Sequence, residues 1–282
     1  MTRLAVRSPR DQVDPGVGVP EANRRRWTPR WATGLIVPFA VLAIWELGAV
    51  IGVISTRLIP PPSTIGATIY DLAASGDLLG HSVTTTWRVL AGFVLGATVA
   101  TVLGAATGVS ERFQALFDPT LQSLRNIPSI AWTPLFILWF GIFETSKVLM
   151  IALGVFFPVY LTFSGAIASV DRGLVEVGRV YGFGRTTLIR RILLPASLPT
   201  YWIGLRNGLG LGWMFVVAAE FLGASQGLGY LLVDGQQTGR PAVIISSIVM
   251  FALLGKITDR LLVSAGARLT GWQDGYIRET RS

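Results

Sequence analysis

Long apolar segments separated by shorter polar stretches run through the 282 residues of the chain. A helix needs about 20 mainly apolar residues to cross a membrane, and six segments are of this kind: 31–54, 89–109, 121–142, 148–169, 205–223 and 242–262. Two polar residues and two prolines interrupt the third segment: Arg125, Asn126, Pro128 and Pro134. Such irregular backbone is tolerated at membrane depth where it packs inside protein or lines a cavity. The pattern predicts an all-α, polytopic membrane protein with six transmembrane helices.

Glycines four residues apart recur within these segments: Gly92 and Gly96, Gly104 and Gly108, and Gly204, Gly208 and Gly212. This spacing lets helix backbones approach each other closely. We expect the glycines to mark packing faces inside one helical bundle, and a seam between two copies of the chain is the alternative.

The polar stretches divide the chain into four regions. Residues 1–30 lack an apolar period and predict a disordered tail. Residues 31–87 hold the first span and an external segment with a short interfacial helix, which we expect Ser63 to cap. Residues 88–268 form the core, with a polar loop at 170–200, and residues 269–282 form a C-terminal tail.

The distribution of positive charge orients the spans. Seven arginines lie in residues 1–30 and five in the 170–200 loop, whereas the opposite side offers only Arg57, Arg88, Lys147 and Arg240. Lysine and arginine concentrate on the cytoplasmic side of membrane proteins. Both tails and the 170–200 loop are therefore predicted to be cytoplasmic, and the net charge of +8 reflects topology and membrane lipid rather than a nucleic-acid partner.

Composition narrows the chemistry further. The chain is 51% hydrophobic and 14% charged, as expected of a membrane protein. It has no cysteine and a single histidine, His81, which excludes thiolate metal sites and multi-histidine metal sites. No metal site is predicted.

The 170–200 loop contains the most distinctive segment, EVGRVYGFGRTTLIRRILLP at 176–195. Its apolar residues recur at helical spacing, interrupted by Gly182 and Gly184, which predicts two short amphipathic helices joined by a glycine turn and closed by Pro195. A cytoplasmic loop built in this way can dock a helix into a groove on a soluble partner.

This segment resembles the EAA loop of bacterial ABC importer permeases. Glu176 stands at the glutamate position of that motif and Gly182 at its glycine, while Val177 and Gly178 replace the two alanines. Further segments resemble the nitrate, sulfonate and taurine subgroup: LRNIP at 124–128, AWTPL at 131–135, WFG at 139–141, VAAE at 217–220 and GLGY at 227–230.

The resemblance implies a type I ABC importer permease in the bacterial plasma membrane. It implies a homodimer of permeases, two cytoplasmic ATPase subunits and an external solute-binding protein. The implied ATPase-coupling helices contain seven motif residues: Glu176, Val177, Gly178, Gly182, Ile192, Leu194 and Pro195. The chain has no GxxxxGK[ST] phosphate loop. ATP and Mg²⁺ are therefore expected on the ATPase, and this chain is expected to be a transporter subunit, not an enzyme, with no cofactor of its own.

Polar residues in the apolar spans are candidates for the translocation path or gate. Glu220 lies in the fifth span, with Arg206 and Asn207 near its cytoplasmic end, and such residues usually face the bundle interior or a cavity. A path role and a structural contact between helices are both open for Glu220, whereas a structural contact is favoured for Glu46. Trp139 is a further path candidate.

The subgroup implies ATP-driven import of a small organic or inorganic anion, such as a sulfonate, taurine or nitrate. A thiamine precursor or riboflavin stays open, because the external binding protein carries most of the selectivity in this family. A secondary transporter or channel would favour internal repeats or charged relays, and a membrane enzyme would need clustered His, Asp or Glu at one membrane face. Neither feature is visible in the sequence.

Overall fold

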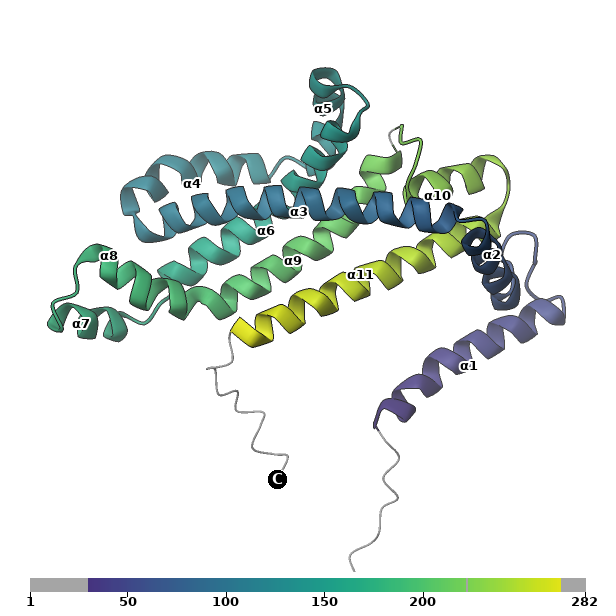
Figure 1. Ribbon diagram of the computed structural model, residues 1–282, viewed down its shortest axis with the longest axis horizontal. Helices are drawn as coiled ribbons and strands as arrows, with labels where there is room; N and C mark the ends of the chain where they lie inside the picture. Colours follow the sequence, from purple (N-terminus) through teal and green to yellow (C-terminus); the bar gives the residue numbers. More distant parts are fainter. Residues whose placement is uncertain (1–29, 222, 270–282) are drawn as a thin grey trace, which may run out of the picture. The chain divides into compact units, whose positions relative to one another are not determined.

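The computed structural model describes residues 30–221 and 223–269, and within them every regular element is a helix (Figure 1). The two predicted tails therefore lie almost entirely outside the described residues. The chain divides into two units, Met1–Ile44 and Trp45–Ser282. The first described helix, α1 (Arg30–Val50), contains Pro38 and runs across this division.

The second unit continues from α1 through a further set of helices: α2 (Pro62–Ala74), α3 (Asp77–Val109), α4 (Glu111–Arg125), η1 (Ser129–Trp132), α5 (Thr133–Phe140), α6 (Glu144–Ala168), α7 (Arg172–Val180), α8 (Arg185–Leu188), η2 (Ile189–Leu193), α9 (Leu194–Phe221), α10 (Leu228–Gln237) and α11 (Pro241–Leu269). The η1 segment is a 3₁₀-helix and η2 is a π-helical turn.

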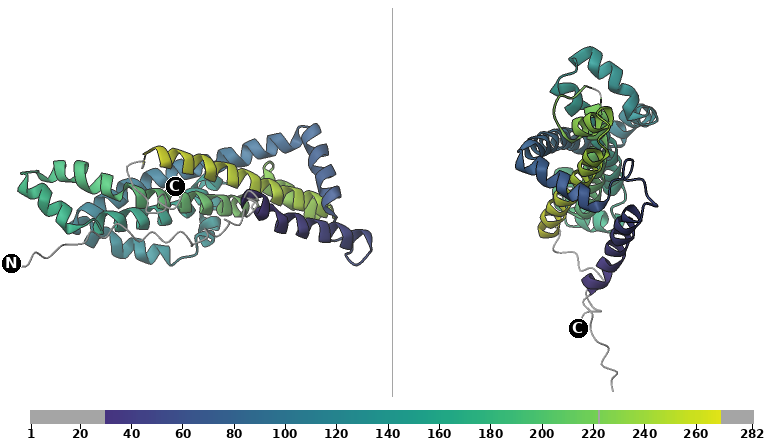
Figure 2. Two further views of the ribbon diagram at one scale, coloured as in Figure 1. Left: turned by 90° about the horizontal axis from the view of Figure 1, so that it is seen from below. Right: turned by 90° about the vertical axis from the view of Figure 1, so that its right-hand side faces the viewer.

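The core of the second unit lies between α3, α6 and α9. These helices run side by side, with α6 packed against both others (Figures 1 and 2). Val89 of α3, Ile151 and Val155 of α6, and Val216 of α9 are fully buried at their contact. Close contact between such side chains stabilises the helical bundle through van der Waals attraction, which is a main source of helix association in membrane proteins.

The glycine spacing marks packing faces within the bundle, as predicted. Seven glycines of α3 and α9 face α6: Gly92, Gly96, Gly104, Gly108, Gly204, Gly208 and Gly212. A Cβ atom at Gly96 would meet the carbonyl oxygen of Ala152, and one at Gly208 would lie 2.7 Å from the side chain of Val159. Glycine is needed at these positions because the neighbouring helix occupies the space of a side chain.

We expect Gly96→Val to destabilise the bundle by about 1–3 kcal/mol, the usual effect of forcing extra atoms into a packed interior. Thermal unfolding of the purified chain in detergent measures this. Gly80→Ala is the matched control, because Gly80 is also in α3 but has open space around it. The control should unfold at the wild-type temperature or slightly above, since alanine favours helix. Equal unfolding temperatures for both variants would contradict the packing role.

Three helices in the described part of the chain are long and apolar enough to cross a membrane: α3, α6 and α11. They contain the second, fourth and sixth predicted spans. The fifth predicted span lies within α9, and Gly34–Val50 of the first is a shorter apolar helix. Since α3 begins at Asp77 and α9 at Leu194, both helices extend well before the apolar segments that indicated them.

The third predicted span, 121–142, is not a single helix. It is divided among the end of α4, a turn at 126–128, η1 and α5. Pro128 lacks the N–H that would continue α4, and a residue before proline is disfavoured in helical conformation. The break therefore falls at the polar residues and proline that interrupt this segment in the sequence.

Glu46 makes the structural contact that was favoured for it. Its carboxylate accepts hydrogen bonds from the Ser63 backbone N–H (3.0 Å) and hydroxyl (2.7 Å). Ser63 is the second residue of α2, and the N-cap of this helix is Pro61. The prediction that Ser63 caps the helix was wrong because Pro62 takes the first helical position, where its missing N–H needs no partner, so the helix begins one residue before Ser63.

Candidate functional site

The glycine turn of the 170–200 loop has the geometry that its sequence predicts. Gly182 has a φ of +75°, in the left-handed region that favours glycine. Its N–H donates to the Arg179 carbonyl (2.9 Å), and the Phe183 N–H donates to the Gly178 carbonyl (3.0 Å). These paired bonds form a Schellman motif, which ends α7 and reverses the chain.

Gly178 explains one departure from the EAA pattern. It is buried on the inner side of α7, where a Cβ atom would lie 2.6 Å from Cδ1 of Ile192. Leu188 packs at the same place and is also buried. The absence of a side chain at Gly178 therefore lets the π-turn, through Ile192, pack directly against α7.

The prediction that Pro195 closes the loop was wrong. Pro195 is the second residue of α9, and helical backbone continues from α8 through η2 into α9. The Leu194 N–H donates to the Ile189 carbonyl five residues back. The π-turn thus accommodates a proline that has no N–H to donate. As a result, the loop connects to the bundle through one unbroken helical path.

The outer side of α7 carries apolar residues that are at least half exposed. Leu174, Val177, Val180 and Tyr181 are 50%, 54%, 86% and 76% exposed. Their spacing of three, three and one residues places them on one side of the helix, and we call them the α7 outer face. Glu176 and all five arginines of the loop are also exposed. An exposed apolar patch rimmed by charge is typical of a protein-docking surface.

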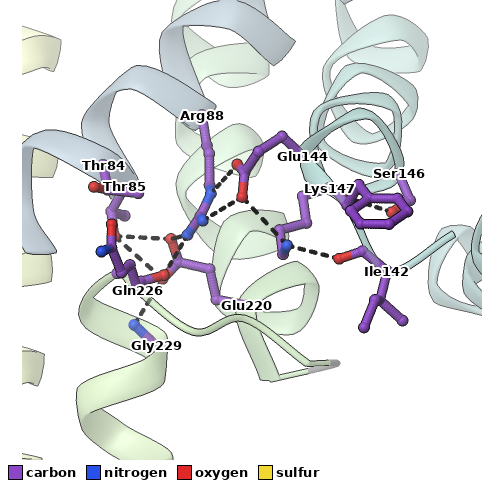
Figure 3. Close-up of polar contacts among 12 residues, drawn as sticks. Thr84, Thr85, Arg88, Ile142, Glu144, Ser146, Lys147, Glu220, Gln226 and Gly229 are labelled. Carbon is purple, nitrogen blue, oxygen red and sulfur yellow. Dashed lines mark hydrogen bonds and ion pairs between the residues drawn. The ribbon is translucent and has the colours of Figure 1, made fainter. Parts of the chain in front are cut away.

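A buried ion pair joins α3 to α9 at the other end of the bundle. Glu220 is 1% exposed and Arg88 is 2% exposed, and Arg88 Nη1 donates to Glu220 Oε1 at 2.7 Å (Figure 3). Glu220 also accepts from the Thr85 hydroxyl (2.8 Å) and from the Gly229 N–H (2.7 Å). These bonds satisfy a carboxylate that would be very unfavourable if it were buried alone.

The same arginine joins α6 to this cluster. Arg88 Nε and Nη2 donate to the two oxygens of Glu144, each at 2.6 Å, in the bidentate geometry favoured by guanidinium and carboxylate (Figure 3). Lys147 donates to Glu144 at 3.4 Å and to the Ile142 carbonyl at 2.9 Å. Arg88 therefore lies at the centre of a network that ties α3, α6 and α9 together.

The importance of Arg88 was missed from the sequence. It was interpreted as one of the charges on the outer side of the membrane that orient the spans, at the end of a helix, because it stands just before the apolar segment 89–109. In the structure α3 begins at Asp77, so Arg88 lies well inside the helix. A single arginine at the border of an apolar span, with Glu220 inside another span, was the available signal.

The other path candidates are not brought together with Glu220. Arg206 pairs with Asp259 of α11 (Nε to Oδ1, 2.6 Å), and Asn207 is exposed. Both lie about 20 Å along α9 from Glu220, at a rise of 1.5 Å per residue. Trp139 is 59% exposed on α5, among aromatic neighbours. Translocation roles for these four residues stay predictions.

Apolar helices packed around an internal ion-pair network, with an arginine-rich helix pair at one end, define a membrane-embedded helical bundle. Residues 79–270 match the family described as "Binding-protein-dependent transport system inner membrane component". The chain therefore belongs to this family.

Individual relatives agree with the family. The chain is 41% identical over 246 residues to "Putative aliphatic sulfonates transport permease protein SsuC" of Bacillus subtilis (strain 168), covering 87% of this chain and 89% of that protein. It is 38% identical to the protein of the same name from Escherichia coli (strain K12), covering 83% and 89%. Because its relatives are permease proteins, the chain is a transporter subunit and not an enzyme.

A solved structure shows the same fold. The structure titled "Inward facing conformations of the MetNI methionine ABC transporter" superposes with a TM-score of 0.53 at 21% identity. The superposition covers 65% of this chain and 92% of that chain. The similarity shows that the bundle shares its fold with a chain of that ABC transporter structure.

Proposed function

We propose that this permease imports a small organic anion, an aliphatic sulfonate in the first place, by ATP-driven alternating access. The sequence similarity to two sulfonate permeases over most of both chains supports this substrate class. The solute would reach the permease from an external binding protein, as the family description indicates.

The α7 outer face is the observation that carries the coupling role. Its apolar residues are exposed at the end of the bundle and surrounded by arginines, which suits a groove on a soluble protein better than lipid. We assign this partner as the cytoplasmic ATPase, which binds ATP and Mg²⁺. Glu176 and Val177 would contact it, while Gly178, Gly182 and Ile192 shape the helix pair.

The helical path from the loop supplies a mechanical link. Within the described residues α7 packs mainly on α8 and η2, and η2 continues directly into α9. From Leu194 to Glu220, α9 extends about 40 Å. Movement of α7 with the ATPase would therefore be transmitted along α9 to the far end of the bundle.

The proposed assembly contains two copies of this chain, two ATPase subunits and one binding protein. Each copy would cross the membrane six times, with α4, η1 and α5 together forming the broken third crossing. Both chain ends and the loop bearing α7 would be cytoplasmic, as the arginine distribution indicates. Residues 88–268 would form the permease core.

Uptake by the reconstituted complex tests the function. The chain is purified with the ATPase and binding protein that accompany it and placed in vesicles containing ATP. We expect ATP-dependent accumulation of a radiolabelled alkanesulfonate, which unlabelled alkanesulfonate abolishes. Import of nitrate or a thiamine precursor in its place would reject the substrate. ATP-independent uptake by the chain alone would reject the importer assignment.

A further inference from the structure

A polar stripe runs along α4, which the coupling mechanism does not use. Its members are four residues apart or three residues apart: Gln114, Asp118, Gln122 and Arg125. This spacing places them on one side of the helix, and we call them the α4 polar stripe. Leu116 lies on the opposite side and is 70% exposed. The helix is therefore amphipathic, unlike the three apolar helices α3, α6 and α11.

Contacts with α6 place this stripe at membrane depth. Leu124 lines a small cavity together with Leu153, which lies near the middle of α6, one of the membrane-crossing helices. The Tyr160 hydroxyl of α6 donates to Asp118 at 3.2 Å. Asp118 lies one to two turns before Leu124 on α4, so the two contacts give the same alignment of α4 along α6. The helix also contacts α3, which it follows directly in the chain (Figure 1). Arg125, next to Leu124, is therefore level with the apolar part of α6 and lies at membrane depth.

Arg125 has no carboxylate partner in the described part of the chain, since none of the salt bridges found there includes it. Its side chain is exposed, as are Gln122 and Asn126. A charged guanidinium facing lipid at this depth is strongly unfavourable, and intramembrane charges usually face a water-filled cavity. The exposed side chain of Arg125 therefore requires contact with water.

The backbone beside Arg125 gives a second, independent argument. Residues 126–128 form an exposed turn, in which the Asn126 and Ile127 N–H groups donate to carbonyls three residues back, and regular helix resumes at Ser129. Non-helical backbone at membrane depth occurs where it is buried in protein or lines a water-filled cavity. Since these residues are not buried, this segment also indicates water on this side of α4.

We infer that the exposed end of the α4 polar stripe, Gln122 and Arg125, lines the aqueous translocation pathway, and that Arg125 contacts the anionic group of the substrate as it passes. The substrate's negative charge rests on the proposed function. A guanidinium donates two parallel hydrogen bonds to an oxyanion such as a sulfonate. With no carboxylate of its own, Arg125 keeps these donors available. Glu220, by contrast, is held inside the ion-pair network away from this stripe.

Cysteine accessibility in the assembled complex tests the lining, because the natural chain contains no cysteine. Gln122→Cys places one thiol in the stripe, and Leu116→Cys places one on the opposite, exposed apolar side of the same helix. We expect a membrane-impermeant methanethiosulfonate reagent to modify Gln122→Cys and not Leu116→Cys, with labelling read on this chain after separation from its partners. Equal labelling of both variants, or of neither, would overturn the lining.

The charge of the reagent tests the role of Arg125 itself. We compare anionic sulfonatoethyl and cationic trimethylammonioethyl methanethiosulfonate, each rate being divided by that for a free thiol in solution. Gln122→Cys should favour the anion by about tenfold, as expected from local attraction of counter-charge. The preference should disappear when Arg125→Gln is added. A preference unaffected by Arg125→Gln would overturn the proposal.

Transport completes the test. Arg125→Gln should lower alkanesulfonate uptake by about tenfold while ATP hydrolysis stimulated by the binding protein persists, and Arg125→Lys should retain much of the uptake. Undiminished uptake by Arg125→Gln would overturn the substrate contact. If the wild-type complex imports no sulfonate, the proposed function fails. The labelling preference at Gln122→Cys still decides separately whether the stripe is aqueous and attracts anions.

Discussion

Replacing Arg88 with methionine is expected to destabilise the helical bundle by about 3–5 kcal/mol, the usual effect of leaving a buried charge without its partner. Methionine fills much of the volume but donates no hydrogen bond. The variant leaves Glu220, which is 1% exposed, with only the Thr85 hydroxyl and the Gly229 N–H as partners. Thermal unfolding of the purified chain in detergent, followed by circular dichroism, measures the loss.

Two further variants identify the cause. Arg206→Met removes the same side chain from an ion pair whose arginine is 53% exposed, and it should unfold close to wild type. Combining Arg88→Met with Glu220→Gln should recover part of the lost stability, because the buried carboxylate is then neutral. If the double variant is less stable than Arg88→Met alone, an unpaired Glu220 charge is not the source of the destabilisation.

Much of the fold could be predicted from local sequence. The glycines of α3 and α9 indicated close helix packing because a missing side chain has one main effect in a helix, which is to let a neighbour approach. Gly182 indicated the turn after α7, since few other residues adopt its conformation. The polar residues and Pro128 indicated the break in the third span.

Helix ends and long-range pairs could not be predicted in the same way. Apolar segments mark where lipid or core surrounds a helix, but backbone hydrogen bonding continues past them, so α3 and α9 begin earlier than the hydropathy indicated. The polar extension of α3 is stable in the interior because Arg88 meets Glu220, 132 positions away. No local pattern contains that information. The α4 polar stripe escaped notice because the predicted third span, 121–142, began inside α4 and separated Gln122 and Arg125 from Gln114 and Asp118.

Replacing Val177 with aspartate is expected to weaken binding of the ATPase to this permease by about tenfold or more, the effect of disrupting a central interface residue. Val177 lies in the middle of the α7 outer face and is 54% exposed, so its substitution removes apolar contact area and adds a carboxylate. Because the contact between α7 and the π-turn is made at Gly178 and Ile192 and not at Val177, the helix pair should keep its fold. Copurification of the ATPase measures binding, and uptake in vesicles should fall in parallel.

Thr186→Asp is the matched control for this prediction. Thr186 is exposed on α8, beyond the Gly182 turn, so the variant introduces the same charge in the same loop but outside the α7 outer face. It should retain both ATPase binding and uptake. If Val177→Asp also retains both, α7 does not dock through this face. Loss of both activities in the two variants alike would instead show that the loop's positive charge, rather than the apolar face, holds the ATPase. A loss confined to Val177→Asp is expected, because a docked helix depends on the residues it buries and charge at the rim contributes less.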